Sequence, residues 1–190
     1  MTKSLPRCSW CLGDPLYLKY HDTEWGVPLY DDQKLFEFLT LETFQAGLSW
    51  LTILRKRENF RSAFDQFDFQ KVASYNSKKT EQLQQNPGII RNKLKIKAAV
   101  NNAVAFLKVI EQEGSFAQYM WQFVEGKPIV NRYLSEKDIP AKTLLAETFS
   151  KDLKQRGFTF VGPTVIYAHM QATGMVNDHV VSCFRHSTVH

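Results

Sequence analysis

The amino-acid sequence predicts an all-α protein, and two observations support this class. Apolar residues recur with a period near 3.6 along the 190-residue chain, and no apolar–polar alternation is long enough to predict a strand. With 44% hydrophobic and 23% charged residues, the composition is that of a globular chain and excludes a disordered one. No repeat, low-complexity tract or linker divides the chain, so we expect residues 1–190 to form a single domain.

The first predicted helix follows Asp31 or Asp32, either of which can cap its N-terminus. Its apolar face begins at Leu35 and recurs at helical spacing. A tight turn at residues 45–47 ends this helix, and a second helix is expected to begin near Ala46.

Five more helices are expected along the chain. They are predicted at residues 68–75, 78–85, 91–112, 115–125 and 141–156. Asn86-Pro87-Gly88 and Glu125-Gly126-Lys127-Pro128 are turn-forming segments between them. We expect residues 126–140 to cross the molecule without regular structure.

Residues 157–177 contain no Asp, Glu, Lys or Arg, and this stretch is long enough to span a bilayer. Three glycines, together with Pro163, His169 and Gln171, argue against a membrane helix. We therefore expect a buried helical hairpin here and no membrane contact.

The chain carries 24 Lys and Arg residues against 19 Asp and Glu residues, for a formal net charge of +5. This excess favours a polyanionic partner and makes a nucleic acid plausible. Residues 87–110 contain no acidic residue, and the basic residues from position 91 onward are Arg91, Lys93, Lys95, Lys97 and Lys108. We interpret this segment as a helix that faces phosphates; a solvated basic face is the alternative.

A second segment suited to phosphate lies at residues 156–164, where a basic helix end, a glycine-bearing turn and a new helix start follow one another. Gly162 would let backbone N–H groups approach a phosphate closely, and the dipole of the next helix would favour the negative charge. An ordinary turn between two helices is the alternative.

Three cysteines, Cys8, Cys11 and Cys183, are too few and too unevenly spaced for a disulfide framework. A reducing, cytoplasmic location is therefore expected. Cys8 and Cys11 could form a thioredoxin-like redox pair, but that chemistry needs a βαβ context that this sequence does not predict.

Glu42 lies where a purely structural residue is not expected. At about 100° per residue it falls between Phe38 and Leu39 on the apolar arc of the first helix, so its side chain is predicted to point inward. Burying an ionised carboxylate without a partner is costly, so this placement indicates a paired cation, a hydrogen-bond network or a ligand. The alternative is a glutamate turned back to solvent at the helix end.

Aromatic residues accompany this carboxylate. Four of them crowd the N-terminal segment: Trp10, Tyr17, Tyr20 and Trp25. Trp50 follows Glu42 by about two helical turns. Flat rings beside one carboxylate suit a planar, electron-poor or cationic ligand such as a purine base, held by stacking and cation–π attraction. The alternative is that these rings belong to the hydrophobic core.

Four candidate metal ligands come from opposite ends of the chain. His179 and Cys183 stand four residues apart in a predicted helix that starts near Asn177, so they would share one face. Cys8 and His21 can complete a tetrahedral Cys2His2 set, which is typical of a structural zinc site. Such an ion would join the termini; the alternative is that these residues bind no metal.

Contiguous motifs along the chain carry a resemblance to a known family. They are Cys8-x-Trp10, Asp14-Pro15-Leu16-Tyr17, Tyr20-His21-Asp22-x-Glu24-Trp25-Gly26, Leu41-Glu42, Gln45-Ala46-Gly47-Leu48-Ser49-Trp50, Gly88-Ile89-Ile90-Arg91-Asn92, Gly157-Phe158-x-Phe160-Val161-Gly162 and Val176-Asn177-Asp178-His179. In this order they resemble DNA-3-methyladenine glycosylase I, a family of the helix-hairpin-helix glycosylase superfamily. The resemblance extends from Cys8 to Cys183.

The resemblance implies an all-α, two-lobed enzyme of the helix-hairpin-helix fold. Such an enzyme removes 3-methyladenine from double-stranded alkylated DNA by hydrolysing the N-glycosidic bond, which leaves an abasic site. Because no lysine stands out as a Schiff-base nucleophile, we expect excision without strand cleavage. We also expect the protein to act as a monomer.

The resemblance further assigns residues to roles, with Glu42 as the expected catalytic residue. The base pocket maps onto Glu42, Tyr20, Trp50, Trp10, Tyr17 and Trp25. The zinc ligands map onto Cys8, His21, His179 and Cys183. The DNA contacts map onto Gly47, Leu48, Arg91, Phe160, Val161, Gly162 and Thr164. In this assignment the turn at Gly47 and Leu48 enters the space that a flipped nucleotide leaves, and Asn177 stands where most of the superfamily carries a catalytic aspartate.

Two functions of other classes also agree with the sequence. One is a non-catalytic, zinc-stabilised DNA-binding module that recognises damage without releasing a base. The other is a thiol oxidoreductase in which Cys8 and Cys11 form a reversible disulfide.

Overall fold

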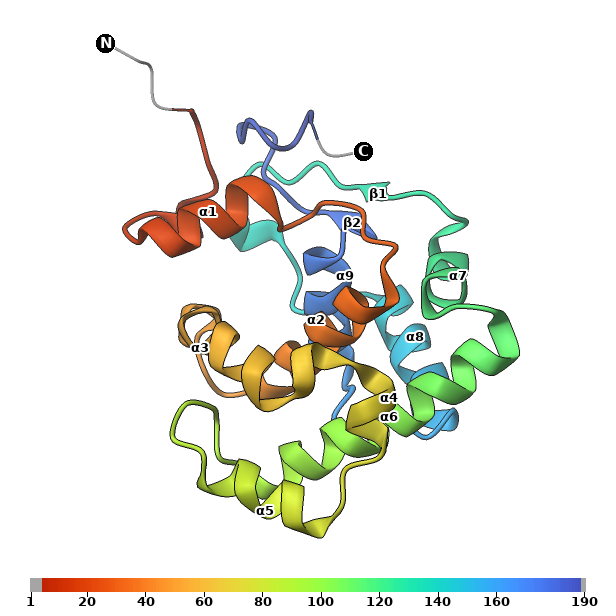
Figure 1. Cartoon of the computed structure of the whole chain (residues 1–190). Coiled ribbons are helices and arrows are strands. Elements are labelled where there is room, and N and C mark those ends of the chain that lie inside the picture. Colours follow the sequence, from red (N-terminus) through yellow and green to blue (C-terminus); the bar gives the residue numbers. More distant parts are fainter. Residues whose placement is uncertain (1–4, 189–190) are drawn as a thin grey trace.

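The computed structural model describes residues 5–188 and confirms a mostly helical chain (Figure 1). In these residues the helices are α1 Pro15–Thr23, α2 Asp32–Gln45, α3 Trp50–Ala63, α4 Phe69–Ala73, α5 Ser77–Gln85, α6 Lys93–Glu113, α7 Phe116–Trp121, α8 Leu144–Gln155 and α9 Pro163–Ala172. Two short strands, β1 (Ile129–Val130) and β2 (Val176–Asn177), pair in parallel. The prediction of no strand was wrong in this detail, because two residues are too few to produce an alternating pattern.

Helix α1 was not predicted from the sequence. Asp14 caps this helix by accepting hydrogen bonds from the backbone N–H groups of Leu16 at 2.8 Å and Tyr17 at 3.4 Å. Pro15 occupies the first helical position, where its missing N–H costs nothing. The Asp-Pro pair is a helix-start signal that could have revealed α1.

Helix α2 is enclosed by the rest of the molecule. Asp31 caps it by accepting a hydrogen bond from the N–H of Lys34 at 2.8 Å. Every residue from position 35 to position 44 is buried. The helix therefore carries buried groups on more than one face, and two of these groups are carboxyl side chains.

Helix α3 begins at Trp50, whereas the sequence predicted a start near Ala46. The difference arises because residues 45–48 form a turn, which confirms the predicted turn and extends it. Ser49 then caps the new helix by accepting a hydrogen bond from the N–H of Thr52 at 3.2 Å.

The helices from α4 to α8 lie within a few residues of the predicted ones. Their starts are set by capping side chains that accept hydrogen bonds from first-turn N–H groups, namely Asp68, Asn76, Asn92, Ser115 and Thr143. Between α7 and α8 lies the crossing segment, residues 126–143. It is irregular as predicted, apart from β1 and a single helical turn at Glu136–Asp138.

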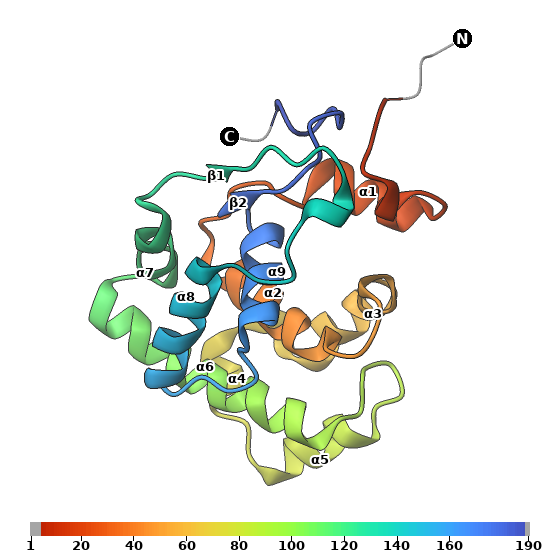
Figure 2. The ribbon, with the colours of Figure 1, turned by 180° about the vertical axis from the view of Figure 1, so that it is seen from behind.

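Helix α9 lies at the centre of the molecule, between α2 and α8, in both Figure 1 and Figure 2. The predicted hairpin at residues 157–177 was wrong, because this stretch contains a loop and the single helix α9. The preceding helix, α8, packs against α9. After α9, the backbone at Gly174 passes close to the backbone of Pro28. Gly174 has φ +75°, and a Cβ there would lie 2.4 Å from the backbone nitrogen of Pro28. Only glycine fits this position without a shift of the backbone.

The two ends of the described chain lie together beside α1 and β1 (Figures 1 and 2). The N–H of Phe184 donates to the carbonyl of Pro6 at 2.9 Å, which joins the two segments directly. Residues 178–188 form turns and no helix. The predicted helix carrying His179 and Cys183 was therefore wrong, and a different geometry places these two side chains.

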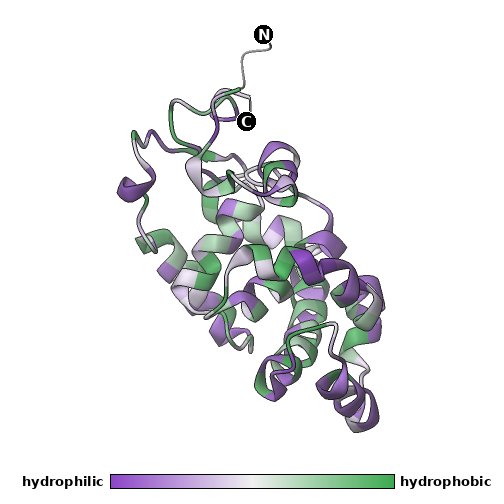
Figure 3. Ribbon diagram, turned by 90° about the vertical axis from the view of Figure 1, so that its left-hand side faces the viewer, coloured by the Kyte–Doolittle hydropathy of each residue, from purple (hydrophilic) through white to green (hydrophobic). Residues whose placement is uncertain are grey.

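The hydrophobic core contains a group of packed aromatic rings on helices α2, α6 and α7. The rings of Phe106 and Phe116 stack with centroids 4.1 Å apart, and Phe36 packs edge-on against Phe106 at 5.3 Å. Figure 3 shows hydrophilic and hydrophobic residues alternating around individual helices, as expected for helices that each turn one face inward. Among the described residues, no helix combines the length and the apolar character that crossing a membrane requires.

Candidate active site and metal cluster

A half-open cavity of about 720 Å³ lies between α1, α2, α3, α9 and the crossing segment. The six residues predicted to form a base pocket all line it: Trp10, Tyr17, Tyr20, Trp25, Glu42 and Trp50. They come from three separate parts of the chain, and the fold brings them to one place. Its size and its aromatic lining suit a small planar ligand.

Glu42 is 4% exposed, so the predicted inward orientation is confirmed. Its carboxyl group has no hydrogen-bond or ion-pair partner within residues 5–188. Burial alone raises its pKa to about 8, because desolvation disfavours the charged form and no cation offsets it. Near neutral pH this group holds a proton unless a positively charged ligand enters the cavity.

Tyr20 and Trp50 stand beside this carboxyl group. Tyr20 is buried, and its ring centroid lies 5.6 Å from that of Trp50. Burial, with a smaller contribution from Glu42, holds the pKa of the Tyr20 hydroxyl well above its ordinary value, so the hydroxyl is a neutral donor. The Trp50 Nε1–H is also buried, and no described group accepts its hydrogen bond. The cavity thus carries polar groups whose hydrogen bonds the protein itself leaves unmade.

Trp10 and Trp25 form a wall that the cavity shares with a cluster of metal-ligand side chains. The Trp10 ring packs edge-on against Trp25 at 5.0 Å and against His21 at 5.4 Å. On the other side, Trp25 packs against His179 at 4.5 Å. A displacement of the cluster would therefore move the aromatic wall of the cavity.

The turn at residues 45–48 forms part of the cavity rim. Ala46 has φ −48° and ψ 116°, and Gly47 has φ +86°. The N–H of Leu48 donates to the carbonyl of Gln45 at 2.7 Å, which closes a type II turn. This turn type requires a positive φ at its third residue, which explains why glycine occupies position 47.

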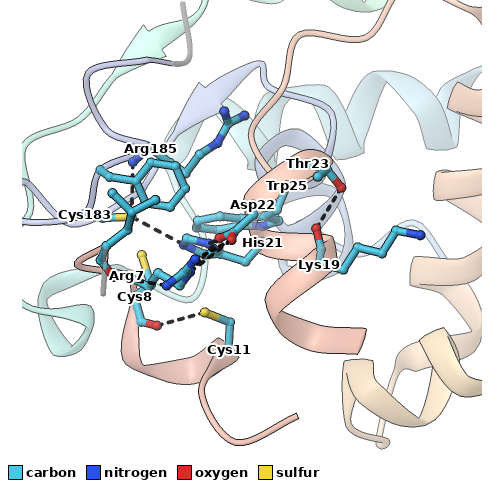
Figure 4. A network of polar contacts seen from close by, with 12 residues as sticks. Arg7, Cys8, Cys11, Lys19, His21, Asp22, Thr23, Trp25, Cys183 and Arg185 are labelled. Atoms are coloured by element: carbon cyan, nitrogen blue, oxygen red, sulfur yellow. Dashed lines mark hydrogen bonds and ion pairs between the residues drawn. The ribbon is translucent and has the colours of Figure 1, made fainter. Parts of the chain in front are cut away.

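Four buried side chains from both ends of the chain converge next to the aromatic wall. They are Cys8, His21, His179 and Cys183, and their ligand atoms all lie within 4.8 Å of one another. Figure 4 shows three of them, Cys8, His21 and Cys183, close to Trp25. Cys183 Sγ is 3.4 Å from His21 Nε2 and 3.6 Å from His179 Nδ1. Cys8 Sγ is 3.7 Å from His179 Nδ1.

These distances fit a single tetrahedral ion. Metal bonds of about 2.3 Å to sulfur and about 2.0 Å to nitrogen place neighbouring ligand atoms about 3.5 Å apart in a tetrahedron. Hydrogen bonding from the Cys8 thiol, followed by contributions from both imidazoles, holds the pKa of the Cys183 thiol well below its ordinary value. A thiolate among two imidazoles and a second cysteine is a donor set for a divalent cation such as zinc.

Each histidine of this cluster is also held on its other nitrogen. His21 Nδ1 lies 2.8 Å from a carboxylate oxygen of Asp22, which Arg7 binds in turn. His179 Nε2 lies 3.2 Å from the carbonyl oxygen of Trp25. Such contacts fix the ring orientation of a metal-binding histidine.

Cys11 lies outside the cluster. Its buried Sγ donates to the carbonyl of Cys8 at 3.1 Å, as Figure 4 shows, and burial raises its pKa to about 11. The described cysteines are all free thiols. Since Cys8 Sγ faces His179, the geometry does not support the redox pair with Cys11.

The basic segment of α6 is only partly the phosphate-facing surface that the sequence predicts. Arg91, Lys93 and Lys97 are exposed. Lys95 is not, because it is 7% exposed and its Nζ donates to the carbonyl oxygens of Phe44, in the last turn of α2, and of Ala46, directly after α2. Its assignment to a phosphate-facing surface was therefore wrong.

The predicted phosphate hairpin lies at the start of α9. Phe160 is 44% exposed with φ 57°, whereas Val161 is buried and its carbonyl accepts a hydrogen bond from Ser150 at 2.6 Å. Gly162 precedes α9 and gives it no side-chain cap. Thr164 lines the cavity. The first N–H groups of α9 are thus open to an anion close to the cavity.

Asn177 does not reach the cavity. It is fully buried, its Nδ2 donates to the carbonyl of His186 at 3.0 Å, and its Oδ1 accepts from the N–H of His179 at 3.2 Å. These bonds give it a structural role beside the cluster.

Helix α9 contributes a wall of the cavity that was not predicted from the sequence. Tyr167 and Gln171 line the cavity, and both donate to the buried carboxylate of Asp178, at 2.5 Å and 2.8 Å. Their spacing with Thr164 places all three side chains on one helix face. That spacing was visible in the sequence, although nothing in it marked this face as functional.

Comparison with known proteins identifies the family. A model of the methyladenine glycosylase family matches residues 10–186. The chain is 49% identical over 179 residues to DNA-3-methyladenine glycosylase 1 of Escherichia coli K12, covering 94% of this chain and 96% of that protein. It is 46% identical over 177 residues to DNA-3-methyladenine glycosylase of Haemophilus influenzae, covering 93% and 96%.

Solved structures agree with this relationship. A crystal structure of 3-methyladenine DNA glycosylase I superposes with a TM-score of 0.91 at 50% identity, covering 94% of this chain and 98% of that one. The Staphylococcus aureus 3-methyladenine DNA glycosylase I superposes with a TM-score of 0.91 at 40% identity, covering 94% and 95%. The chain therefore belongs to the methyladenine glycosylase family and is an enzyme of that class, a hydrolase of N-glycosyl bonds.

Proposed function

We propose that this enzyme excises 3-methyladenine from double-stranded alkylated DNA and leaves an abasic site without cutting the strand. The observation that carries the proposal is the buried, unpartnered carboxyl group of Glu42 in an aromatic cavity. The names of the relatives support the substrate, as does a related glycosylase structure described as a complex with 3-methyladenine.

The cavity selects by charge and by shape. Adenine methylated at N3 is positively charged within the nucleotide, so it can pair with the Glu42 carboxylate and stack on Trp50. Ordinary adenine is neutral, so it does not compensate the cost of ionising the buried Glu42 and gains no ion pair with it. Because this attraction exists before the bond breaks, it raises selectivity more than the rate of the chemical step.

The chemistry needs little acid assistance. The methylated base leaves as a neutral molecule, and positive charge moves to the sugar as the glycosidic bond lengthens. DNA phosphates and the Glu42 carboxylate can stabilise that charge. Asn177 is engaged with His186 and takes no part, and no lysine is among the described residues that line the cavity, which supports excision without a Schiff base.

The DNA would meet the face around the cavity rim. In this proposal the fold is a single helix-hairpin-helix domain of two lobes, in which residues 160–164 bind a phosphate through the uncapped start of α9. Arg91 adds a charged contact, and the turn at Gly47 and Leu48 fills the gap that the extruded nucleotide leaves. A monomeric state and a cytoplasmic location stay predictions.

Zinc is the proposed occupant of the Cys2His2 cluster. Cys8, His21, His179 and Cys183 would hold it, and when bound it would supply a structural cross-link between the two ends of the chain. We expect elemental analysis to find about one zinc per chain. Cys8→Ser should lower the melting temperature more than it lowers the activity of the folded fraction. Metal-free protein of full stability would contradict this role.

A product assay tests the proposed activity. The wild-type enzyme is incubated with methylated and with unmethylated duplex DNA, and the released bases are separated by chromatography while strand length is followed on a denaturing gel. We expect free 3-methyladenine from the methylated duplex alone, and intact strands. Binding of methylated DNA without base release would favour the non-catalytic DNA-binding module instead.

A further inference from the structure

Lys95 occupies an unfavourable place in its own helix. It lies in the first turn of α6, where the helix dipole is positive and a cation is destabilising. It is also buried, whereas Lys93 and Lys97 on either side of it are exposed. A buried cation at this end of a helix needs a partner elsewhere in the fold.

That partner is the end of α2. The Lys95 Nζ donates to the carbonyl oxygen of Phe44 at 2.9 Å and to that of Ala46 at 2.7 Å. Carbonyl groups at a helix C-terminus have no partner within the helix, and they form the negative end of its dipole. Lys95 therefore acts as a cationic cap supplied to α2 by another helix.

One of these carbonyls belongs to Phe44, directly before the exposed turn at residues 45–48, and the other belongs to Ala46 within the turn. The turn is closed by its own bonds, since Gln45 Nε2 donates to the carbonyl of Leu48 at 2.6 Å. Apart from the adjacent residues, no atom of residues 5–188 lies within 4 Å of a Cβ placed on Gly47. The turn thus projects from the cavity rim, and Lys95 holds it from within the fold through the Ala46 carbonyl.

We propose that Lys95 is a positioning residue for nucleotide extrusion: it fixes the turn at residues 45–48 so that the turn can fill the gap in the duplex. This inference rests on the proposed function. A turn that must replace a base in the stack has to be rigid. Two charge-assisted hydrogen bonds, one to Ala46 within the turn and one to Phe44 just before it, supply that rigidity. The same bonds draw two carbonyl oxygens inward, away from the phosphates of the DNA.

The test compares Lys95→Met with Lys97→Met, a matched control that removes the same charge from the exposed face of the same helix. Two dissociation constants are measured for DNA, one for a duplex with a tetrahydrofuran abasic analogue and one for the unmodified duplex. The affinity for free 3-methyladenine is followed by tryptophan fluorescence. The analogue duplex contains the gap that the turn is proposed to fill, whereas the free base tests the cavity alone.

We expect Lys95→Met to lose the preference for the abasic analogue by roughly tenfold, the scale of one charge-assisted hydrogen bond. Its affinity for free 3-methyladenine should stay within about twofold of wild type. Lys97→Met should weaken binding to both duplexes equally and keep the preference, because it removes only a phosphate-directed charge.

A folded Lys95→Met protein with the wild-type preference would overturn the inference. An equal loss of affinity for free 3-methyladenine would do the same, because it would show a purely structural role. If Lys95→Met does not fold, Lys95→Gln gives a second test, because its shorter neutral side chain removes the charge and keeps a hydrogen-bond donor; a partial loss of the preference with unchanged base affinity is expected. Failure of the proposed function is distinguishable, since wild-type protein would then bind neither the free base nor the analogue preferentially.

Discussion

Helix α2 carries two glutamates that are almost equally buried but differently partnered. Glu37 is 5% exposed, and its Oε1 accepts hydrogen bonds from Arg57 at 2.6 Å and Arg61 at 3.0 Å. Glu42 is 4% exposed and has no partner among residues 5–188. Burial is therefore the same at the two positions, and only the availability of a cation distinguishes them.

The difference separates a structural carboxylate from one kept for a ligand. Arg57 also binds Glu24, directly after α1, at 2.6 Å, so the Glu37 network joins the end of α1 to α2 and α3. This network uses the charge of Arg57 and leaves Glu42 without a counter-ion from the protein. A buried group that the fold fails to satisfy is destabilising by itself, and its retention is understandable where function needs it.

Breaking the structural pair is expected to have the largest effect. Arg57→Met leaves Glu37 buried with Arg61 as its remaining cation, and the free energy of unfolding should fall by about 3 kcal/mol. Urea denaturation measures this change. The folded fraction should bind 3-methyladenine as the wild type does. A loss of base affinity in fully folded protein would show that the two carboxylates do not have separate roles.

Removing the charge of Glu42 should have the next largest effect, and it should act on activity. Glu42→Gln keeps the shape of the side chain, and we expect single-turnover release of 3-methyladenine to slow by roughly 100-fold. Glu37→Gln is the matched control on the same helix. The folded fraction of Glu37→Gln should retain wild-type activity per molecule. An equal loss of activity in both variants would contradict the distinction between a structural and a ligand-binding carboxylate.

The smallest of these effects is a gain in stability. Glu42 has a folded pKa of about 8 against a reference value of 4.5, so between these values the folded state holds a proton that the unfolded state has released. Wild-type stability therefore falls as pH rises from about 4.5 to about 8. Glu42→Gln removes this loss, and at pH 7 it should raise the free energy of unfolding by about 1–3 kcal/mol.

This gain can be checked by urea denaturation at several pH values. The advantage of Glu42→Gln should be small near the lower end of that range and level off at the upper end. A variant less stable than wild type at pH 7 would show that Glu42 has a stabilising partner in the folded protein.

The helical class and the inward position of Glu42 could be predicted because both depend on local periodicity. Helix-start signals are equally local. The Asp14-Pro15 pair is such a signal, and it was overlooked. The turn at Gly47 could be recognised because a glycine at a positive φ leaves a trace in the sequence.

The features that could not be predicted depend on long-range contacts. Lys95 looks like its exposed neighbours in the sequence, and only the position of α2 turns it inward. His179 and Cys183 were grouped for the wrong reason, because irregular turns and not a helix bring them together with Cys8 and His21. The Glu37 network and the cavity wall formed by α9 also depend on contacts between separate helices, and no local sequence pattern predicts them.

The affinity of the cavity for a permanently cationic purine tests the central claim most directly. The ligand is 3,9-dimethyladeninium, titrated against wild type and Glu42→Gln over a range of pH. Because the cation must displace the Glu42 proton, the wild-type association constant should rise by up to about tenfold per pH unit and level off near the free-enzyme pKa of about 8. Glu42→Gln should show weaker binding that does not change with pH. Wild-type affinity that is the same at every pH would contradict the claim that an unpartnered carboxyl group receives the positive base.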